Sequence, residues 1–254
     1  MSLLSYFELT LIEFTLFVLI VLIASTVRGF SGFGFAAISV SGLSFILPPI
    51  EIVPVILILE VLVSIFMIPY IWDKIDWKLV VLVLIGIIIG SPLGVYFLKI
   101  FSANLTHLLI SIIIIFFSSI LIKGYLNKRL NTSPMKIFTG TVGGVINGLT
   151  TLGGLPCAIF LLATGFEASI IRGSLAALFF FTDIYALFLS FFAEIIDMKS
   201  IYRVLPLIII LPIGIKIGDI FFNKSREQTY RKFVLYFLIF ISFFGIIKVL
   251  TNIY

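Results

Sequence analysis

The chain has 254 residues, of which 61% are hydrophobic and only 11% charged, and its mean hydropathy is +1.30. These values exclude an ordinary water-soluble domain and predict one membrane domain over residues 1–254. The formal net charge of +5 does not indicate nucleic-acid binding, because the basic residues stand in short segments between apolar runs, where they set membrane topology. With one histidine, His107, and one cysteine, Cys157, we expect no disulfide framework, no metal site and no cofactor.

Apolar runs of about 20 residues, the length that crosses about 30 Å of hydrocarbon, recur along the chain. Most of these runs are continuous, but two are interrupted midway by glycine-rich sequence and are predicted to be broken helices or helical hairpins. In chain order we expect a broken element at 10–47, spans at 51–71, 79–99 and 105–123, a second broken element at 137–164, and spans at 169–193, 201–223 and 233–250.

The two breaks belong to an internal repeat. Gly29 to Ala37 aligns with Gly148 to Pro156 at an offset of 119 residues, and further matches follow in the same order, such as Ile75-Asp76-Trp77-Lys78 with Ile196-Asp197-Met198-Lys199. The sequence therefore predicts two repeats, at 8–125 and 134–254, each with one broken element and three transmembrane helices. Repeats with paired broken helices are typical of secondary transporters.

The distribution of Lys and Arg indicates how the repeats cross the membrane. If both broken elements re-enter on their own side, 11 basic residues lie inside and 4 outside, whereas eight plain spans give 9 inside and 6 outside. The re-entrant arrangement is favoured, and it makes the two repeats inverted with both termini outside. We expect a multi-pass protein of a prokaryotic cell (inner) membrane.

Irregular backbone at membrane depth persists only where it faces protein or a water-filled cavity, so both breaks are predicted to line one. Glycine allows close backbone approach, and a helix that restarts after a break presents free N–H groups to an anion. The alternative is that the glycines only allow close helix packing, which we prefer for Gly90, Gly94, Gly214 and Gly218. The predicted substrate-binding residues are Arg28, Gly29, Ser31, Gly32, Gly34, Asn147, Gly148, Thr150, Thr151, Gly153 and Gly154.

Arg28 follows an 18-residue apolar run, and an ionised side chain inside the membrane is a functional hypothesis by default. Its guanidinium suits carboxylate, sulfite or sulfonate oxygens. The alternative is an internal ion pair with Glu60 or Asp183, and these two carboxyls could instead carry protons, because burial favours their neutral form. Arg172 is expected to extend to the lipid headgroups unless it closes the site from the cytoplasmic side.

Other classes of protein find less support. No His-Glu-x-x-His zinc motif can be built with one histidine, and the Gly218-Asp219 pair does not match an intramembrane aspartyl protease motif. A serine nucleophile would have His107 as its sole imidazole base, and this residue lies at the start of a span in a loop predicted to be external. An enzyme is not expected. An anion channel or a carrier for a small carboxylate stays open, although glycine-rich filters usually come from oligomeric rings.

Three segments resemble the TauE/SafE sulfite exporter family, also called TSUP: Arg28-Gly-Phe-Ser-Gly-Phe-Gly-Phe, Asn147-Gly-Leu-Thr-Thr-Leu-Gly-Gly-Leu-Pro-Cys and Ile171-Arg172-Gly173-Ser174. The similarity extends over essentially the whole chain. It implies a transporter linked to the proton motive force, with protons as the coupling ion and sulfite, sulfoacetate, other organosulfur anions or some carboxylates as substrates. The chain departs from the pattern at Ala36-Ala37, where the second repeat has Leu155-Pro156, and at Leu155, where a proline is frequent.

Overall fold

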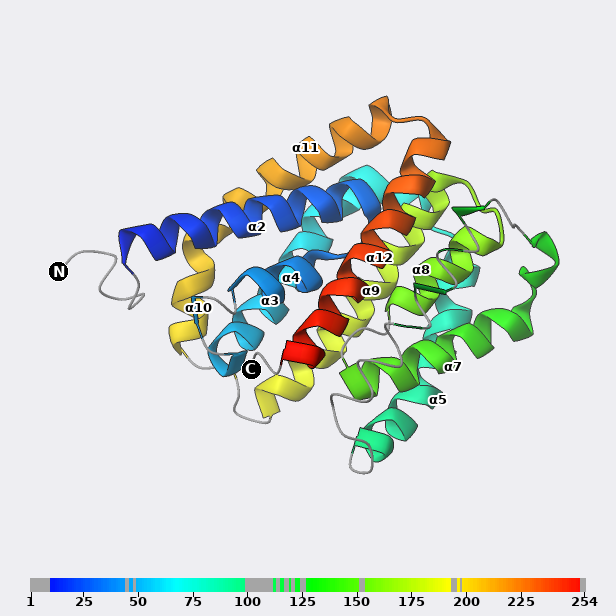
Figure 1. The fold of residues 1–254 in the computed structure, drawn as a ribbon, viewed down its shortest axis with the longest axis horizontal. Helices are drawn as coiled ribbons and strands as arrows, with labels where there is room; N and C mark the ends of the chain where they lie inside the picture. The colour runs from blue at the N-terminus through cyan, green and yellow to red at the C-terminus, as the bar shows by residue number, and fades with distance from the viewer. Residues whose placement is uncertain are drawn as a thin grey trace. The chain divides into compact units, whose positions relative to one another are not determined.

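A computed structural model describes residues 10–43, 46–47, 49–98, 112, 115–116, 119, 122–123, 127–150, 154–192, 196 and 198–251. Within these residues all regular structure is helical (Figure 1), as the sequence predicts. The predicted span at 105–123 lies largely outside them. The helices are α2 (Leu11–Ser31), α3 (Phe35–Leu43), α4 (Pro49–Ile71), η1 (Trp72–Lys74), α5 (Trp77–Leu98), η2 (Lys128–Leu130), α7 (Ser133–Thr150), α8 (Gly154–Ala163), α9 (Ala168–Phe192), α10 (Met198–Val204), η3 (Leu205–Leu207), α11 (Ile210–Lys224) and α12 (Glu227–Thr251).

Four helices of the described part are long and apolar enough to cross a membrane: Leu11–Ser31, Glu51–Lys74, Trp77–Gly94 and Ala168–Phe188. A fifth candidate is the pair Met198–Leu207 and Ile210–Lys224, which is bent by 48°. The sequence predicts a span at 201–223, and the structure divides this segment into two helical parts. Pro206 and Pro212 have no N–H to donate to the carbonyls one turn before them, so the helix bends between them.

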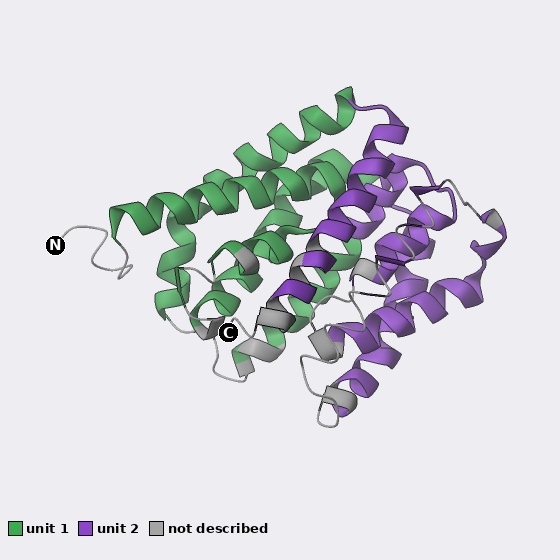
Figure 2. Cartoon of the chain, viewed as in Figure 1, with its two compact units in different colours: residues 1–73, 176–224 green, residues 74–175, 225–254 purple. Residues whose placement is uncertain are grey.

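The chain divides into two compact units, residues 1–73 with 176–224 and residues 74–175 with 225–254 (Figure 2). In the first unit α2 and α11 lie side by side (Figure 1). Glycines bring them together: a Cβ at Gly29 would lie 2.6 Å from the Ile215 carbonyl oxygen, and one at Gly218 would lie 2.2 Å from the Thr26 carbonyl oxygen. Both contacts are far shorter than any side chain allows, so the small residue is required for this packing.

In the second unit α5 packs along α7 in the same manner. A Cβ at Gly90 would lie 2.1 Å from the Thr141 carbonyl oxygen, and one at Gly140 would lie 2.1 Å from the Val83 carbonyl oxygen. At Gly214, in α11, a Cβ would lie 2.9 Å from the Leu22 carbonyl oxygen of α2, so the packing role expected for Gly90, Gly214 and Gly218 is confirmed, and that of Gly94 stays a prediction. Since lipid supplies no hydrophobic drive between apolar helices, such close backbone contact is a main source of their association.

Helix boundaries recur with the spacing of the predicted repeat. Ser31 and Thr150, the last residues of α2 and α7, are 119 positions apart, as are Phe35 and Gly154, which begin α3 and α8. Pro49 and Ala168, which begin α4 and α9, have the same separation. The two breaks thus fall at equivalent positions, although residues 151–153 lie outside the described part. Each compact unit contains helices from both repeats.

Candidate substrate and coupling site

The first break is built by local contacts between residues 28 and 34. Gly32 caps α2 in the left-handed conformation, with φ 84°, and donates its N–H to the Arg28 carbonyl oxygen at 2.8 Å. Gly34 has φ 93°, a second value that favours glycine. The Ser31 hydroxyl lies 2.7 Å from the Val27 and Phe33 carbonyl oxygens and accepts the Phe33 N–H at 3.3 Å. The chain therefore stops one helix and starts the next within three residues.

Arg28 lies in the last turn of α2, directly before this break, and its side chain is fully buried. Its Nη2 donates to the Ser64 hydroxyl oxygen at 2.9 Å. Its guanidinium carbon stands 4.6 Å from the centre of the Phe179 ring, a cation–π contact. Nε and Nη1 have no hydrogen-bond partner among the described residues. Buried guanidinium donors without acceptors are costly, which makes them a candidate anion site.

Two buried carboxyl groups accompany Arg28 in the same unit. Glu60 and Asp183 are each 6% exposed, and both act electrostatically on the guanidinium. The Glu60 Oε1 atom accepts the Ala36 N–H at 3.2 Å, so this carboxylate covers the start of α3. Glu60 and Asp183 also act electrostatically on one another. The structure gives a through-space electrostatic effect of both acids on Arg28, and an internal ion pair of Arg28 with Glu60 or Asp183 stays a prediction.

The groups around Arg28 occupy equivalent positions of the two predicted repeats. Glu60 and Ser64 are one turn apart on α4, and Phe179 and Asp183 are one turn apart on α9. Glu60 corresponds to Phe179, and Ser64 to Asp183, at the same separation of 119 residues. The residues around Arg28 thus come from two equivalent positions in each half of the sequence. These positions hold a carboxyl and a hydroxyl group in α4 and a phenyl ring and a carboxyl group in α9.

The other predicted residues of the first break serve its backbone or helix packing in this structure. Gly29 lies against α11, and Gly32 and Gly34 supply the left-handed turns. The single hydroxyl proton of Ser31 has two carbonyl acceptors within the break. Substrate contact by these four residues stays a prediction.

The predicted residues of the second break are less fully described. Asn147 lies in the last turn of α7 and is partly exposed, and Gly154 begins α8. Gly148 and Thr150 belong to α7, but the surroundings of these two residues lie outside the described part. Thr151 and Gly153 lie outside it entirely. Their role stays a prediction.

Arg172 differs from expectation. Its side chain is 2% exposed, so it does not extend to lipid headgroups as predicted. It lies on the part of α9 that belongs to the second unit and acts electrostatically on Tyr230 of α12, which is 1% exposed. The position early in a long helix suggested a surface side chain, but in the folded chain this side chain is buried.

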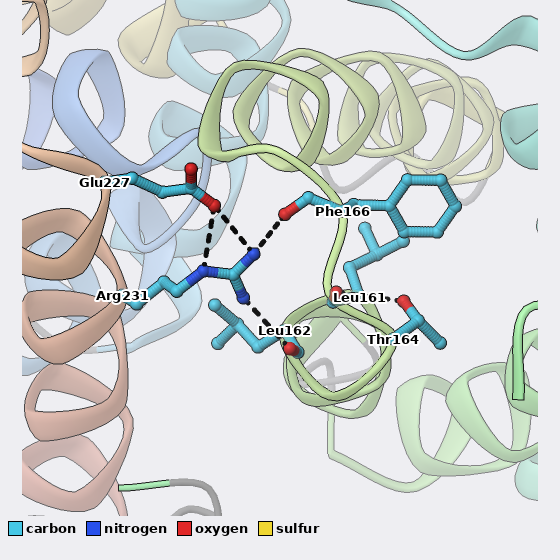
Figure 3. Close-up of polar contacts among 6 residues, drawn as sticks. All are labelled: Leu161, Leu162, Thr164, Phe166, Glu227 and Arg231. Carbon is cyan, nitrogen blue, oxygen red and sulfur yellow. Dashed lines mark hydrogen bonds and ion pairs between the residues drawn. The ribbon is translucent and has the colours of Figure 1, made fainter. Parts of the chain in front are cut away.

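Arg231 is a residue that the sequence did not single out, and in the structure it contacts two backbone carbonyl groups and Glu227 (Figure 3). Its Nη1 donates to the Leu162 carbonyl oxygen at 3.0 Å and its Nη2 donates to the Phe166 carbonyl oxygen. Glu227, one turn earlier on α12, accepts from its Nε at 3.1 Å. The last carbonyls of a helix have no partner within it, so Arg231 completes the C-terminal end of α8.

Long apolar helices, glycine-mediated helix contacts and a buried charged cluster beside a helix break define a helical membrane transport protein. The family model described as Sulfite exporter TauE/SafE matches residues 17–244, so the chain belongs to this family. It is accordingly a multi-pass membrane protein of a transporter family, and not an enzyme. Searches of the curated proteins and of the solved structures found no match.

Proposed function

We propose that this protein is a secondary transporter of a small anion, either sulfite or an organosulfur anion, driven by the proton motive force. The observation that carries the proposal is the set of unfilled donors on the fully buried Arg28 beside the break. A buried cation with free N–H groups binds an oxyanion strongly, because water does not compete there and the hydrogen bonds are charge-assisted.

The position of the cluster supports transport more than storage or signalling. Arg28 is the last charged residue before a broken helix, and α3 restarts with its N–H groups beside the same cluster. Helix N-termini at such breaks are typical anion contacts of transporters. Glu60 and Asp183 provide groups that can hold protons at this depth, which is the feature a proton-coupled carrier needs.

The proposed cycle is alternating access between two inverted repeats, with both termini outside the cell. Its support is the recurrence of helix ends at one spacing and the excess of basic residues in the segments assigned to the inside. Asn147, which occupies the position of Arg28 in the second repeat, is proposed as an uncharged donor for the same anion. Asn147→Ala tests that role on its own.

The test is thermal stabilisation of the purified protein by sulfite, sulfate, methanesulfonate, sulfoacetate, taurine and simple carboxylates, since a ligand that binds the folded state raises its apparent stability. The wild type should respond to one class of anion, and Arg28→Ala should lose the response. Arg203→Ala is the matched control: Arg203 is also buried, but it pairs with Glu51 at 2.7 Å, so its loss should lower stability while preserving the anion response. A response that survives in Arg28→Ala would place the anion elsewhere.

A carrier is also distinguished from a channel by flux. Uptake of labelled anion into vesicles should saturate and should follow an imposed pH gradient. Single-channel steps of current carried by the same anion would reject the carrier.

A further inference from the structure

The Glu60 carboxylate already makes contacts that a substrate anion at this site would make. Its carboxylate accepts the Ala36 N–H near the start of α3 and lies in the field of Arg28. These are the two features that would attract an external oxyanion, a helix N-terminus and a buried guanidinium. The second of them is not saturated, because Nε and Nη1 of Arg28 have no hydrogen-bond partner among the described residues.

The charges of the cluster do not balance without a proton. Arg28 contributes one positive charge, and two ionised carboxyls would contribute two negative charges. Arg28, Glu60 and Asp183 are all buried, at 0%, 6% and 6% exposed, so an uncompensated charge among them would be costly. One proton held by either carboxyl makes the cluster neutral, which is the state that burial favours.

The charged groups on the helices that contact α2 and α4 have other surroundings. On α11, Lys216 is exposed and Asp219 accepts from Asn223 Nδ2 at 3.0 Å. On α10, Arg203 pairs with Glu51 in the first turn of α4, nine residues before Glu60. The charges that act on Arg28 are those of Glu60 and Asp183, so the charge count is taken over these three groups.

We propose that Glu60 is an internal competitor of the substrate and that a monovalent anion binds Arg28 together with one proton, which neutralises Glu60. At rest Arg28 is positive, Glu60 is ionised and accepts the Ala36 N–H, and Asp183 holds the one proton. In the occupied state the anion replaces Glu60 as the counter-charge, and both carboxyls are protonated. The second proton comes from hydronium or a buffer acid in the solvent, which loses an O–H or N–H bond as one O–H bond forms at Glu60, and the cluster is neutral in both states.

This inference rests on the proposed function and narrows it in two respects. It sets the ratio at one proton taken up for each monovalent anion bound. It also selects monoanions, such as a sulfonate or hydrogen sulfite, over dianions such as sulfate, because the two carboxyls can accept only one further proton. A bound dianion would leave one buried negative charge unbalanced.

The experiment is titration calorimetry of methanesulfonate into the purified full-length protein near neutral pH, in two buffers of different ionisation enthalpy, which gives the number of protons taken up. Methanesulfonate keeps its charge across this range, so any proton belongs to the protein. The wild type should take up about one proton per anion and should bind sulfate at least about tenfold more weakly. Glu60→Gln/Asp183→Asn should bind methanesulfonate with no proton uptake and with an affinity that does not change with pH.

Glu51→Gln is the matched control, since Glu51 is a half-exposed carboxylate on the same helix, and it should keep the wild-type proton count. The wild-type measurement needs no variant, so a double variant that fails to fold does not remove the test. Zero uptake by the wild type, unchanged uptake in a folded double variant, or binding of sulfate in preference to methanesulfonate overturns the inference while leaving the transporter proposal in place. Absence of binding by every anion tested overturns the proposed function as well.

Discussion

Replacing Arg231 should promote local unfolding of α8 far more than replacing Glu227, its acidic partner, does. The side chain is 17% exposed and donates to two carbonyl oxygens, those of Leu162 and Phe166, at the end of α8. Hydrogen bonds to charged groups contribute about 1.5–3 kcal/mol each, so Arg231→Met should cost about 3 kcal/mol, at the lower end for two bonds because of the partial exposure. Glu227 is 52% exposed and one turn away, and a pair of this kind contributes about 0.3–0.5 kcal/mol.

Cys157 provides the assay. It is the one cysteine of the chain, it lies in α8, and it is 2% exposed, so a thiol reagent reaches it only when α8 opens. A change of 1.4 kcal/mol is a factor of ten, so about 3 kcal/mol predicts labelling roughly a hundredfold faster in Arg231→Met when opening is fast and reversible. Glu227→Gln should accelerate labelling by about twofold. Equal acceleration in the two variants would show that the ion pair, and not the carbonyl contacts, holds the end of α8.

Two further changes test the helix contacts and the break through the melting temperature. Gly90→Ala places a Cβ 2.1 Å from a backbone oxygen of Thr141, so α5 and α7 must separate, and the free energy of unfolding should fall by about 2–3 kcal/mol. Gly42→Ala meets only the flexible Ile20 side chain at 2.9 Å and should lower it by less than about 1 kcal/mol. A larger loss of stability in Gly42→Ala than in Gly90→Ala would contradict the packing described. Gly32→Ala places an L-residue at φ 84° and should lower the free energy of unfolding by about 1–2 kcal/mol. Gly32→Asn should lower it less, because asparagine tolerates this conformation better. If Gly32→Ala melts at the same temperature as the wild type, the left-handed cap is not needed.

The composition and the glycine positions determined much of the architecture. A mean hydropathy of +1.30 with 11% charged residues leaves a helical membrane protein as the natural outcome, because backbone groups in lipid must bond within their own segment. The breaks were also predictable, since Gly32 and Gly34 adopt backbone angles that other residues avoid. The bend between α10 and α11 could have been predicted from Pro206 and Pro212, but the span was placed from the length of the apolar run, which carries no information on a bend.

What only the tertiary structure decided is which side chains meet. Sequence pattern marked Arg28, Glu60 and Asp183 as unusual charges in apolar helices, but their assembly depends on how α2, α4 and α9 pack, and no local pattern encodes contacts between residues so far apart. The same holds for the contact of Gly29 with α11, for the burial of Arg172, and for Arg231, which donates to the carbonyl oxygens of Leu162 and Phe166. From the sequence alone it follows that the chain lies in lipid, that it is helical and where the first helix breaks, because these features depend on composition and on local backbone conformation. The charge balance at Arg28 arises only when distant helices enclose it.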